Sequence, residues 1–499
     1  MADSYPLLIR SKPGIKRDGT LFEGDFYVDG QWVRFQRGLP RKMGGYKKIA
    51  TLQETSRGIH VHPSNGSQYI HTGGKQYLYQ IQTDAFGNVL YANDRTPSGF
   101  TASDYNSWTL GVMFDAVSTK STIIAHASQN LVNMDNEVAT PIYYGEVTAS
   151  SALTTTSQSV CGGFVVVHPY LFKFCKGGYV AWSVPNKPAD FSNTGSGEAR
   201  VAGTKIVKGL PLRGTGAGPA ALLWSLDSLI QVVKTDSAAI FTFNTVTDQT
   251  SILSPNSVIE YDGMYFWIGV DRFLVFNGVV RELPNDMNIN YFFENLNLAY
   301  RHKVFAFKVP RFGEIWWCYP RGSATECSHA VIYNVRENSW YDTALPGAGR
   351  SAGSHANLYT KPFMAEGTTL WQHETGTDEV GGTGALPIRS YFETAEFTLL
   401  SQETPSLSSL KVERIEPDFV QKGPMTIQVK GRANARAPED YSEVQTAPEI
   451  ATRADQQTVT FRGVRRLMRF RFESNKIGGD YQMGQCYAHI APADGRVTS

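Results

Sequence analysis

The class of fold is decided by residues 261–278, which read YDGMYFWIGVDRFLVFNG. Two apolar and aromatic runs, 264–268 and 273–276, are separated by a four-residue turn and followed by Asn277-Gly278. Aromatic and β-branched residues favour strands, and Asn-Gly is typical of the tight turns that join antiparallel strands. This stretch therefore predicts a β-hairpin at the centre of one antiparallel sheet.

The same arrangement recurs between residues 51 and 395. A second hairpin is predicted where 314–319 (EIWWCY) and 330–335 (AVIYNV) flank a loop and precede Trp340. Sets of four short strands within about 40 to 60 residues predict a β-propeller with about five or six irregular blades. Because no WD dipeptide or kelch signature marks a repeat, two packed β-sandwiches are the alternative. Shorter apolar runs lie at 69–71, 77–81, 122–125, 164–167, 221–224 and 230–233.

The pattern changes after Phe397, where a polar connector, 401–409, leads into alternating apolar and polar residues. Residues 396–499 are therefore predicted to form a smaller antiparallel β-sandwich, and residues 1–50 an N-terminal extension. In the last run, Met468, Phe470 and Phe472 share one face with Arg466, while Arg465, Leu467, Arg469 and Arg471 share a face expected to be solvated. The predicted strands are 415–420, 425–429, 459–461 and 464–472, and the one notable helix is predicted at 291–296.

Composition excludes several classes of protein. The 499 residues carry a net charge of +1 and only 19% are charged, which excludes a disordered polyelectrolyte. The five cysteines include no Cys-x-x-Cys pair, so we expect neither a disulfide framework nor a zinc ribbon, and we expect folding in a reducing cytoplasm. Neither a signal peptide nor a membrane-spanning segment is predicted.

No motif indicates catalysis. A G-x-S-x-G nucleophile elbow and a sialidase Asp box are both absent from the sequence. His60, His62 and His71 could approach one another across a hairpin, but no local carboxylate completes a metal shell. Glu439-Asp440 lies in a polar connector, where two solvated acids are the ordinary interpretation. We therefore predict no enzymatic activity, no cofactor and no metal.

Two groups of basic residues are candidates for contacts with other chains. The N-terminal group lies outside the blade pattern, where it could cross a neighbouring subunit or, alternatively, form an edge strand on its own C-terminal domain. The C-terminal group lies in the Arg-rich run 462–476, for which we favour a protein interface over DNA contact. The candidate residues are Trp32, Arg34, Arg37, Arg41 and Lys42, together with Arg465, Arg469 and Arg471.

Residues 29–46 read DGQWVRFQRGLPRKMGGY, a pattern of Trp, Arg, Pro and Gly that the formation of β-hairpins does not require. They resemble the opening of the tail nozzle proteins of short-tailed bacteriophages, also called head-completion or packaged-DNA stabilisation proteins. Further matches follow in order at 179–183, 314–317, 333–340 and 469–484. The resemblance covers most of the chain, and none of its motifs is catalytic.

The resemblance implies a structural role in the virion tail. It implies a hexameric ring below the portal and its adaptor, with a propeller in each subunit, made in the host bacterial cytoplasm and not inserted in a membrane. The channel would hold packaged double-stranded DNA until ejection, and further partners would be tailspikes or tail fibres and a tail needle or plug. The middle of the chain, 51–400, has 29 acidic and 23 basic residues, a balance that favours DNA passage over tight DNA binding.

Two other functions are weighed against this one. The first is a carbohydrate-binding propeller for host attachment, in which exposed aromatics such as Trp108, Trp182 or Trp371 would stack on sugars. Most aromatics lie inside apolar runs, which favours core positions instead. The second is a hydrolase, because a propeller can carry an active site, but no residue supports it specifically.

Overall fold

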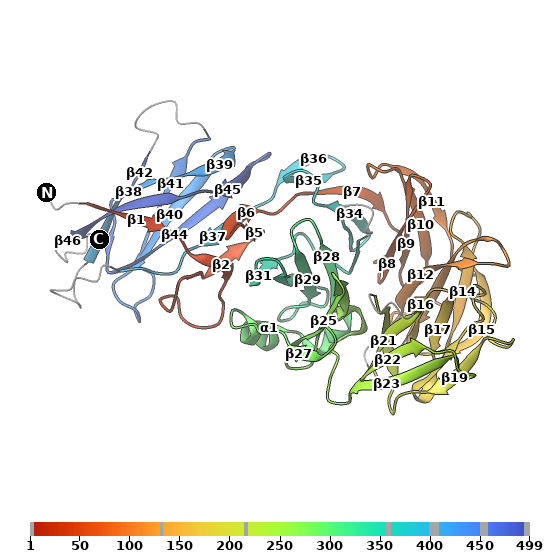
Figure 1. The fold of residues 1–499 in the computed structure, drawn as a ribbon. Coiled ribbons are helices and arrows are strands. Elements are labelled where there is room, and N and C mark those ends of the chain that lie inside the picture. Colours follow the sequence, from red (N-terminus) through yellow and green to blue (C-terminus); the bar gives the residue numbers. More distant parts are fainter. Residues whose placement is uncertain are drawn as a thin grey trace.

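The protein is an all-β molecule built almost entirely from antiparallel sheets (Figure 1). The computed structural model describes residues 4–129, 133–213, 218–355, 361–398, 409–449 and 458–493. Within these ranges there is one α-helix, α1 (Ile289–Asn295), which confirms the helix predicted at 291–296. Short 3-10 turns occur as η1 (Lys176–Gly178), η2 (Pro255–Ser257) and η3 (Leu298–Lys303).

Six sheets follow one another along the chain, and each consists of four consecutive antiparallel strands. They are β8–β11 (Ile59–Ser64, Ser67–Gly73, Leu78–Thr83, Val89–Asp94), β12–β15 (Ser107–Asp115, Lys120–Ser128, Thr140–Glu146, Thr154–Val160), β16–β19 (Gly163–Val167, Tyr170–Phe174, Tyr179–Trp182, Gly197–Arg200), β20–β23 (Ile206–Pro211, Ala220–Ser225, Leu229–Lys234, Phe241–Thr247), β24–β27 (Ile259–Tyr261, Met264–Ile268, Phe273–Phe276, Val280–Glu282) and β28–β31 (Phe305–Val309, Glu314–Tyr319, His329–Asn334, Ser339–Ala344).

Turn chemistry explains why the chain folds into these hairpins. The turn between β24 and β25 places Asp262 at φ 49° and Gly263 at φ 79°. Two consecutive residues in the left-handed region match the right-handed twist of the strands they connect, and Asp-Gly is among the sequences that tolerate this best. Residues 269–272 form the next turn, and the antiparallel pairing of β25 with β26 confirms the hairpin predicted at 264–276.

A seventh sheet combines the end of this series with a strand from the N-terminal region. It contains β32 (Ala352–Ser354), β33 (Phe363–Glu366) and β34 (Thr369–His373), followed by β7 (Tyr46–Thr51), β35 (Asp378–Gly381) and β36 (Gly384–Pro387). β7 runs antiparallel to β34, and its first residues also pair with β35. The described residues of this region therefore form seven sheets, whereas the sequence predicted five or six blades. The prediction was too low because one sheet is short, spanning only 259–282, and because β7, which completes the seventh sheet, lies in the predicted N-terminal extension.

The first strands of the seven sheets lie around a common centre. β12 contacts β8 and β16, β20 contacts β16 and η2, and β28 contacts β24 and β32. The series closes on itself because β32 also contacts β8. Apolar residues of the seventh and first sheets, including Leu52, Ile70 and Phe363, form one buried cluster across this closure.

A second unit, at the left of Figure 1, is assembled from both ends of the chain. Each of its three main sheets pairs at least one strand from residues 5–42 with strands from beyond residue 389. The sheets are β1-β46-β38-β42 with β43 (Tyr5–Ile9, Cys486–Ala493, Ser409–Glu416, Val459–Thr460, Val464–Arg465), β4-β37-β44-β40-β41 (Asp29–Gln31, Ser390–Glu393, Leu467–Ser474, Met425–Arg432, Tyr441–Ala447) and β39-β45-β6-β5 (Phe419–Lys422, Asp480–Met483, Leu39–Lys42, Val33–Gln36), beside the parallel pair β2 (Lys12–Ile15) and β3 (Phe26–Tyr27).

Two predicted boundaries differ from the sheets. The strand predicted at 415–420 is divided, because β38 ends at Glu416 and β39 begins at Phe419 in another sheet, with Pro417 between them. β37 precedes the boundary predicted at residue 396, yet it pairs with β44 of the C-terminal unit. Residues 401–408 of the predicted connector lie outside the described residues.

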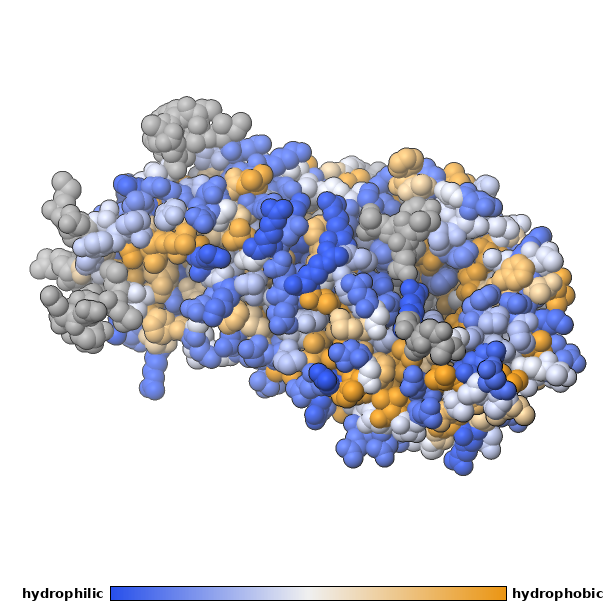
Figure 2. All heavy atoms as spheres, viewed as in Figure 1, coloured by the Kyte–Doolittle hydropathy of each residue, from blue (hydrophilic) through white to orange (hydrophobic). Residues whose placement is uncertain are grey.

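The two units share one continuous hydrophobic core. Trp32 and Phe35 belong to a buried cluster that contains Trp316 and Phe307 of the seven-sheet unit as well as Phe472 of the C-terminal unit. Hydrophilic residues cover the junction on the face drawn in Figure 2. The junction is therefore packed like a domain interior beneath a polar surface, which makes independent motion of the two units costly.

Candidate assembly interface

Trp32 lies between β4 and β5 and is buried at the junction of the two units. Its indole ring makes edge contacts with Tyr46 and Trp316, with ring centres 6.0 Å apart in each case. Its backbone is in the left-handed region, with φ 53°. Two hydrogen bonds support that backbone, because Trp32 N donates to Thr343 Oγ1 at 2.8 Å and Ser390 Oγ donates to Trp32 O at 2.9 Å. Trp32 is thus an internal tie between the units and not a surface residue.

Arg34 is one of the most deeply buried cations in the described structure, with 1% of its surface exposed. Its guanidinium donates to Glu374 at 2.9 Å and to Glu314 at 3.1 Å, and it lies 3.7 Å from the centre of the Phe312 ring. Burial opposes its charge, but the two carboxylates prevail and raise the pKa of Arg34. Burial also raises the pKa of Glu314, and the charge of Arg34 offsets part of that increase. Arg34 therefore joins β5 to the seven-sheet unit by a buried ion network.

The remaining N-terminal candidates differ in exposure. Lys42 is buried and donates from Nζ to the carbonyl of Gly479 at 2.7 Å. Arg37 is exposed at the tip of the β5–β6 hairpin, and its backbone N–H is hydrogen-bonded by Glu337 at 3.0 Å. Arg41 is half-buried and donates to Gln36 at 2.8 Å. Of the five candidates, Arg37 and Arg41 retain surface that a second chain could contact.

The C-terminal arginines lie in an internal network and not on the solvated face that strand alternation predicts. Arg469 is 8% exposed and donates to Glu393 at 3.1 Å and to Glu396 at 3.0 Å. Arg471 donates to Glu393 at 3.0 Å, and buried Arg465 donates to Asp440 at 2.8 Å. The acids of β37 and of the loop after β40 cover this face, so the expectation of solvent exposure is wrong for Arg465 and Arg469.

The charge of Glu393 is maintained by the cations around it. Burial acts to raise its pKa, but the hydrogen bond from Lys430 and the charges of Lys430, Arg469 and Arg471 lower the pKa below its ordinary value. The network is thus balanced inside one subunit. Glu393 and Glu396 could not be singled out from the sequence because they lie more than 70 residues before Arg469 and Arg471; the local signal was only an acid at the end of a short strand and a second acid three residues later.

The aromatic residues suggested for sugar stacking are core residues. Trp108, Trp182 and Trp371 are 4%, 5% and 6% exposed. The indole of Trp108 donates to the carbonyl of Gly74 at 2.8 Å, and that of Trp371 donates to Glu366 at 2.9 Å. The suggestion that these three rings are exposed is wrong, because each belongs to a strand whose apolar face packs against a neighbouring sheet.

Two groups of neighbouring exposed apolar residues stand out among those on the surface, and the sequence did not single them out. Leu8 of β1 lies opposite Tyr487 of β46, and each is 38% exposed. On the seven-sheet unit, the exposed apolar residues are Phe86, which precedes β11, and Val89, Leu90 and Tyr91 of β11 itself, the outermost strand of its sheet. Exposed apolar groups that cluster in this way are typical of contact surfaces. Both sets lie at sheet edges, which could be recognised only once strand order was known.

The three histidines considered for a metal site lie in or beside the first hairpin of the seven-sheet unit. His60 and His71 are directly opposite in the β8–β9 pair, but within the described ranges no set of three His, Cys, Asp or Glu side chains is placed to hold a metal ion. The described part of the chain also has no helix with the length and apolar character needed to cross a bilayer.

No protein-family model matches the chain, and no curated protein is similar to it in sequence. Its function must therefore be argued from its own residues and their arrangement.

Proposed function

We propose that the chain is a structural subunit of the tail of a short-tailed bacteriophage, forming a ring, or nozzle, below the portal and adaptor. The observation that supports this best is the position of residues 29–46, the segment whose sequence resembles the opening of the nozzle proteins. They supply β4, β5, β6 and the start of β7, which belong to three different sheets. The segment that resembles the family is therefore the one that joins the two units into a single body.

We also propose that the seven sheets are the blades of a β-propeller. Four-stranded antiparallel sheets, first strands in cyclic contact and a last sheet completed by an N-terminal strand are all typical of that architecture. By completing the last blade, β7 would join the N-terminal end of the blade series to its C-terminal end and so close the ring of blades.

A rigid subunit suits the proposed role. A ring that retains packaged DNA under pressure transmits force from subunit to subunit, and a hinge between the two units would dissipate it. The shared core around Trp32 and the buried Arg34 network oppose such a hinge. Arg37 and Arg41 lie at the surface near this core, where they are available to contact a neighbouring subunit.

The proposal is tested by the mass and shape of the purified protein, alone and mixed with the portal and adaptor of the same virus. Light scattering and negative-stain microscopy should show a six-fold ring attached to the portal–adaptor complex. A protein that stays monomeric beside that complex would contradict the proposal. A trimer would favour a receptor-binding role.

Point variants are the appropriate second step. Removing residues 1–45 would delete β1 to β6 and unfold the C-terminal unit, so loss of assembly would be uninformative. Arg37→Ala combined with Arg41→Ala leaves the sheets intact and should weaken ring formation if these residues contact a neighbour. Lys120→Ala, an exposed residue of β13, is the matched control.

A further inference from the structure

A cavity of about 200 Å³ lies where the first strands of five of the seven sheets converge. Its walls come from β8, β12, β20, β28 and β32 and from the turns η2 and η3, so residues from 57 to 353 contribute to it. This volume is several times the ~30 Å³ that a water molecule occupies in the liquid. The cavity can therefore hold a small molecule and not only a single water.

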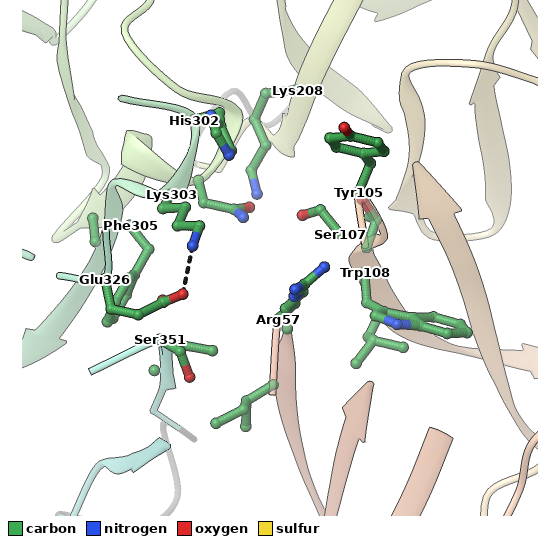
Figure 3. A pocket seen from close by; sticks show the side chains of 18 of the residues that line it. Arg57, Tyr105, Ser107, Trp108, Lys208, His302, Lys303, Phe305, Glu326 and Ser351 are labelled. Carbon is green, nitrogen blue, oxygen red and sulfur yellow. Dashed lines mark hydrogen bonds and ion pairs between the residues drawn. The ribbon is translucent and has the colours of Figure 1, made fainter. Parts of the chain in front are cut away.

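Cationic side chains point into this cavity from separate elements. Figure 3 shows Lys208, Arg57 and Lys303 with their nitrogens directed toward the shared space. Two acids line it as well, and both have other partners. Glu326 is paired with Lys303, and Asp104 is paired with Lys75, which lies outside the lining, at 2.9 Å. The balance inside the cavity is therefore positive.

Lys208 is the unbalanced member of the set. Lys303 has Glu326 and the Thr325 carbonyl as acceptors, and Arg57 donates to the carbonyl of Asp104. In the described structure Lys208 has no acceptor and no ion-pair partner, although it lies on the first strand of an interior sheet. Lys208 is half-buried, and moving an ammonium group away from water without a counter-charge is costly unless a ligand supplies one.

The surroundings of His302 show the same positive field. Burial, together with the smaller effects of the charges of Lys303, Arg57 and Arg301, lowers the pKa of His302 to about 4. His302 is therefore neutral near pH 7 and adds a hydrogen-bonding group to the cavity. Ser107 and Asn256 add further polar groups, while Leu110 and Phe305 supply apolar wall.

We propose that this cavity binds a small oxyanion, a phosphate or a carboxylate, with Lys208 as its principal counter-charge and Arg57 beside it. The oxyanion would accept hydrogen bonds from cations on different sheets and would neutralise the excess positive charge at the centre of the unit. This inference does not depend on the proposed role in a phage tail, because it rests on the interior of one subunit.

The protonation of Lys208 gives the proposal a second measurable property. Burial lowers the pKa of Lys208 to about 8. The charged and titratable groups that line the cavity with it are Arg57, Asp104, Tyr105, His302, Lys303 and Glu326, while the flanking strands β16 and β21 and the turn η2 contribute no charged side chain. A bound anion favours the protonated amine, so binding at pH 8 should take up a fraction of a proton per site.

The test is calorimetric titration of the full-length protein with inorganic phosphate and, separately, with sodium acetate. The titrations are made at pH 7 and pH 8, at constant ionic strength set with sodium chloride. We expect saturable binding of at least one of the two anions, and the one that binds more tightly identifies the preferred class. At pH 8 the measured heat should depend on the ionisation enthalpy of the buffer, because a proton is taken up.

Lys208→Met is the decisive variant, since it preserves the length of the side chain and removes its charge. It should weaken anion binding at least tenfold and abolish the proton uptake. Its melting temperature should equal or exceed that of the wild type without anion, because a half-buried charge without a counter-charge has been removed, so lost binding would not reflect unfolding. Lys476→Met, at an exposed turn, should bind as the wild type does.

Three outcomes would overturn the proposal. They are the absence of saturable binding by either anion, binding that Lys208→Met leaves unchanged, and an effect that sodium chloride reproduces at the same ionic strength.

Discussion

At the scale of single residues, the buried cations determine how this protein tolerates change. Arg34, Arg465 and Arg469 each lie against carboxylates contributed by distant segments. A buried ion pair contributes modestly compared with an apolar replacement of the whole pair, but removing one partner leaves an uncompensated charge. Single substitutions in these networks should therefore be far more damaging than their surface-like sequence pattern predicts.

Arg34→Met should lower the free energy of unfolding by about 3–5 kcal/mol, because Glu314 and Glu374 would lose their buried counter-charge. Urea unfolding followed by tryptophan fluorescence measures this directly. Arg37→Met, three residues away and exposed, should change the free energy of unfolding by less than about 0.5 kcal/mol. Equal effects from the two variants would show that the Arg34 network contributes nothing specific.

His126 should make the protein sensitive to mild acid. It is fully buried, accepts or donates at 2.7 Å with Thr140 Oγ1, and burial lowers its pKa to about 4. The unfolded chain binds a proton near pH 6.5, whereas the folded protein resists it until about pH 4. The stability that neutral His126 contributes is therefore present above pH 6.5 and is lost as the pH falls toward 4.

Comparison of the wild type with His126→Gln isolates this effect. The variant cannot titrate there, so the difference in the free energy of unfolding between the two proteins should shrink by about 2 kcal/mol from pH 7 to pH 5. The measurement is denaturant unfolding at both values of pH. Parallel pH dependence of the two proteins would exclude His126 as a source of acid sensitivity.

At the scale of elements, β7 is the strand on which the seventh sheet depends. Lys47 pairs with Gln372 of β34 on one side and with Val380 of β35 on the other. A proline there removes an N–H from a strand that is paired on both sides. Lys47→Pro should lower the free energy of unfolding by about 3 kcal/mol or more. It should also make residues 46–58 susceptible to limited proteolysis.

Leu90→Pro is the control for this prediction. Leu90 lies in β11, at the outer edge of its sheet, where the register shifts between Val89 and Tyr91. Proline is tolerated best at edges and irregularities of this kind, so this variant should stay close to the wild type in stability and protease resistance. If both prolines had the same small effect, β7 would not be needed to complete the sheet.

The elements also show what local sequence can predict. The hairpins at 264–276 and 314–334 follow from residues adjacent in the chain, namely apolar runs and turn formers, and both were predicted. The pairings of β1 with β46, β4 with β37 and β6 with β45 join opposite ends of the chain. No local pattern encodes such partners, so the alternative of an N-terminal edge strand on the C-terminal domain could be stated but not chosen from sequence.

At the scale of the whole molecule, the two units form one body around a common core, and hydrophilic residues cover their junction on the face drawn in Figure 2. The all-β class could be predicted from composition and alternation, whereas the contribution of residues 5–42 to the sheets of the C-terminal unit could not. The central cavity could not, because Arg57, Lys208 and His302 are ordinary polar residues in sequence and acquire meaning only when the sheets converge. The burial of Arg469 likewise depends on acids from a strand far from its own.

The position of β7 has a consequence for how the protein is made. A ribosome releases Tyr46–Thr51 early, but Ala50 finds its neighbour Leu370 only after six complete sheets have emerged. During that interval β7 has two unpaired edges, and closing so long a loop slows the last step of folding. Two nascent chains held close together could exchange this strand, so dilute expression or slower synthesis should increase the yield of correctly closed monomer.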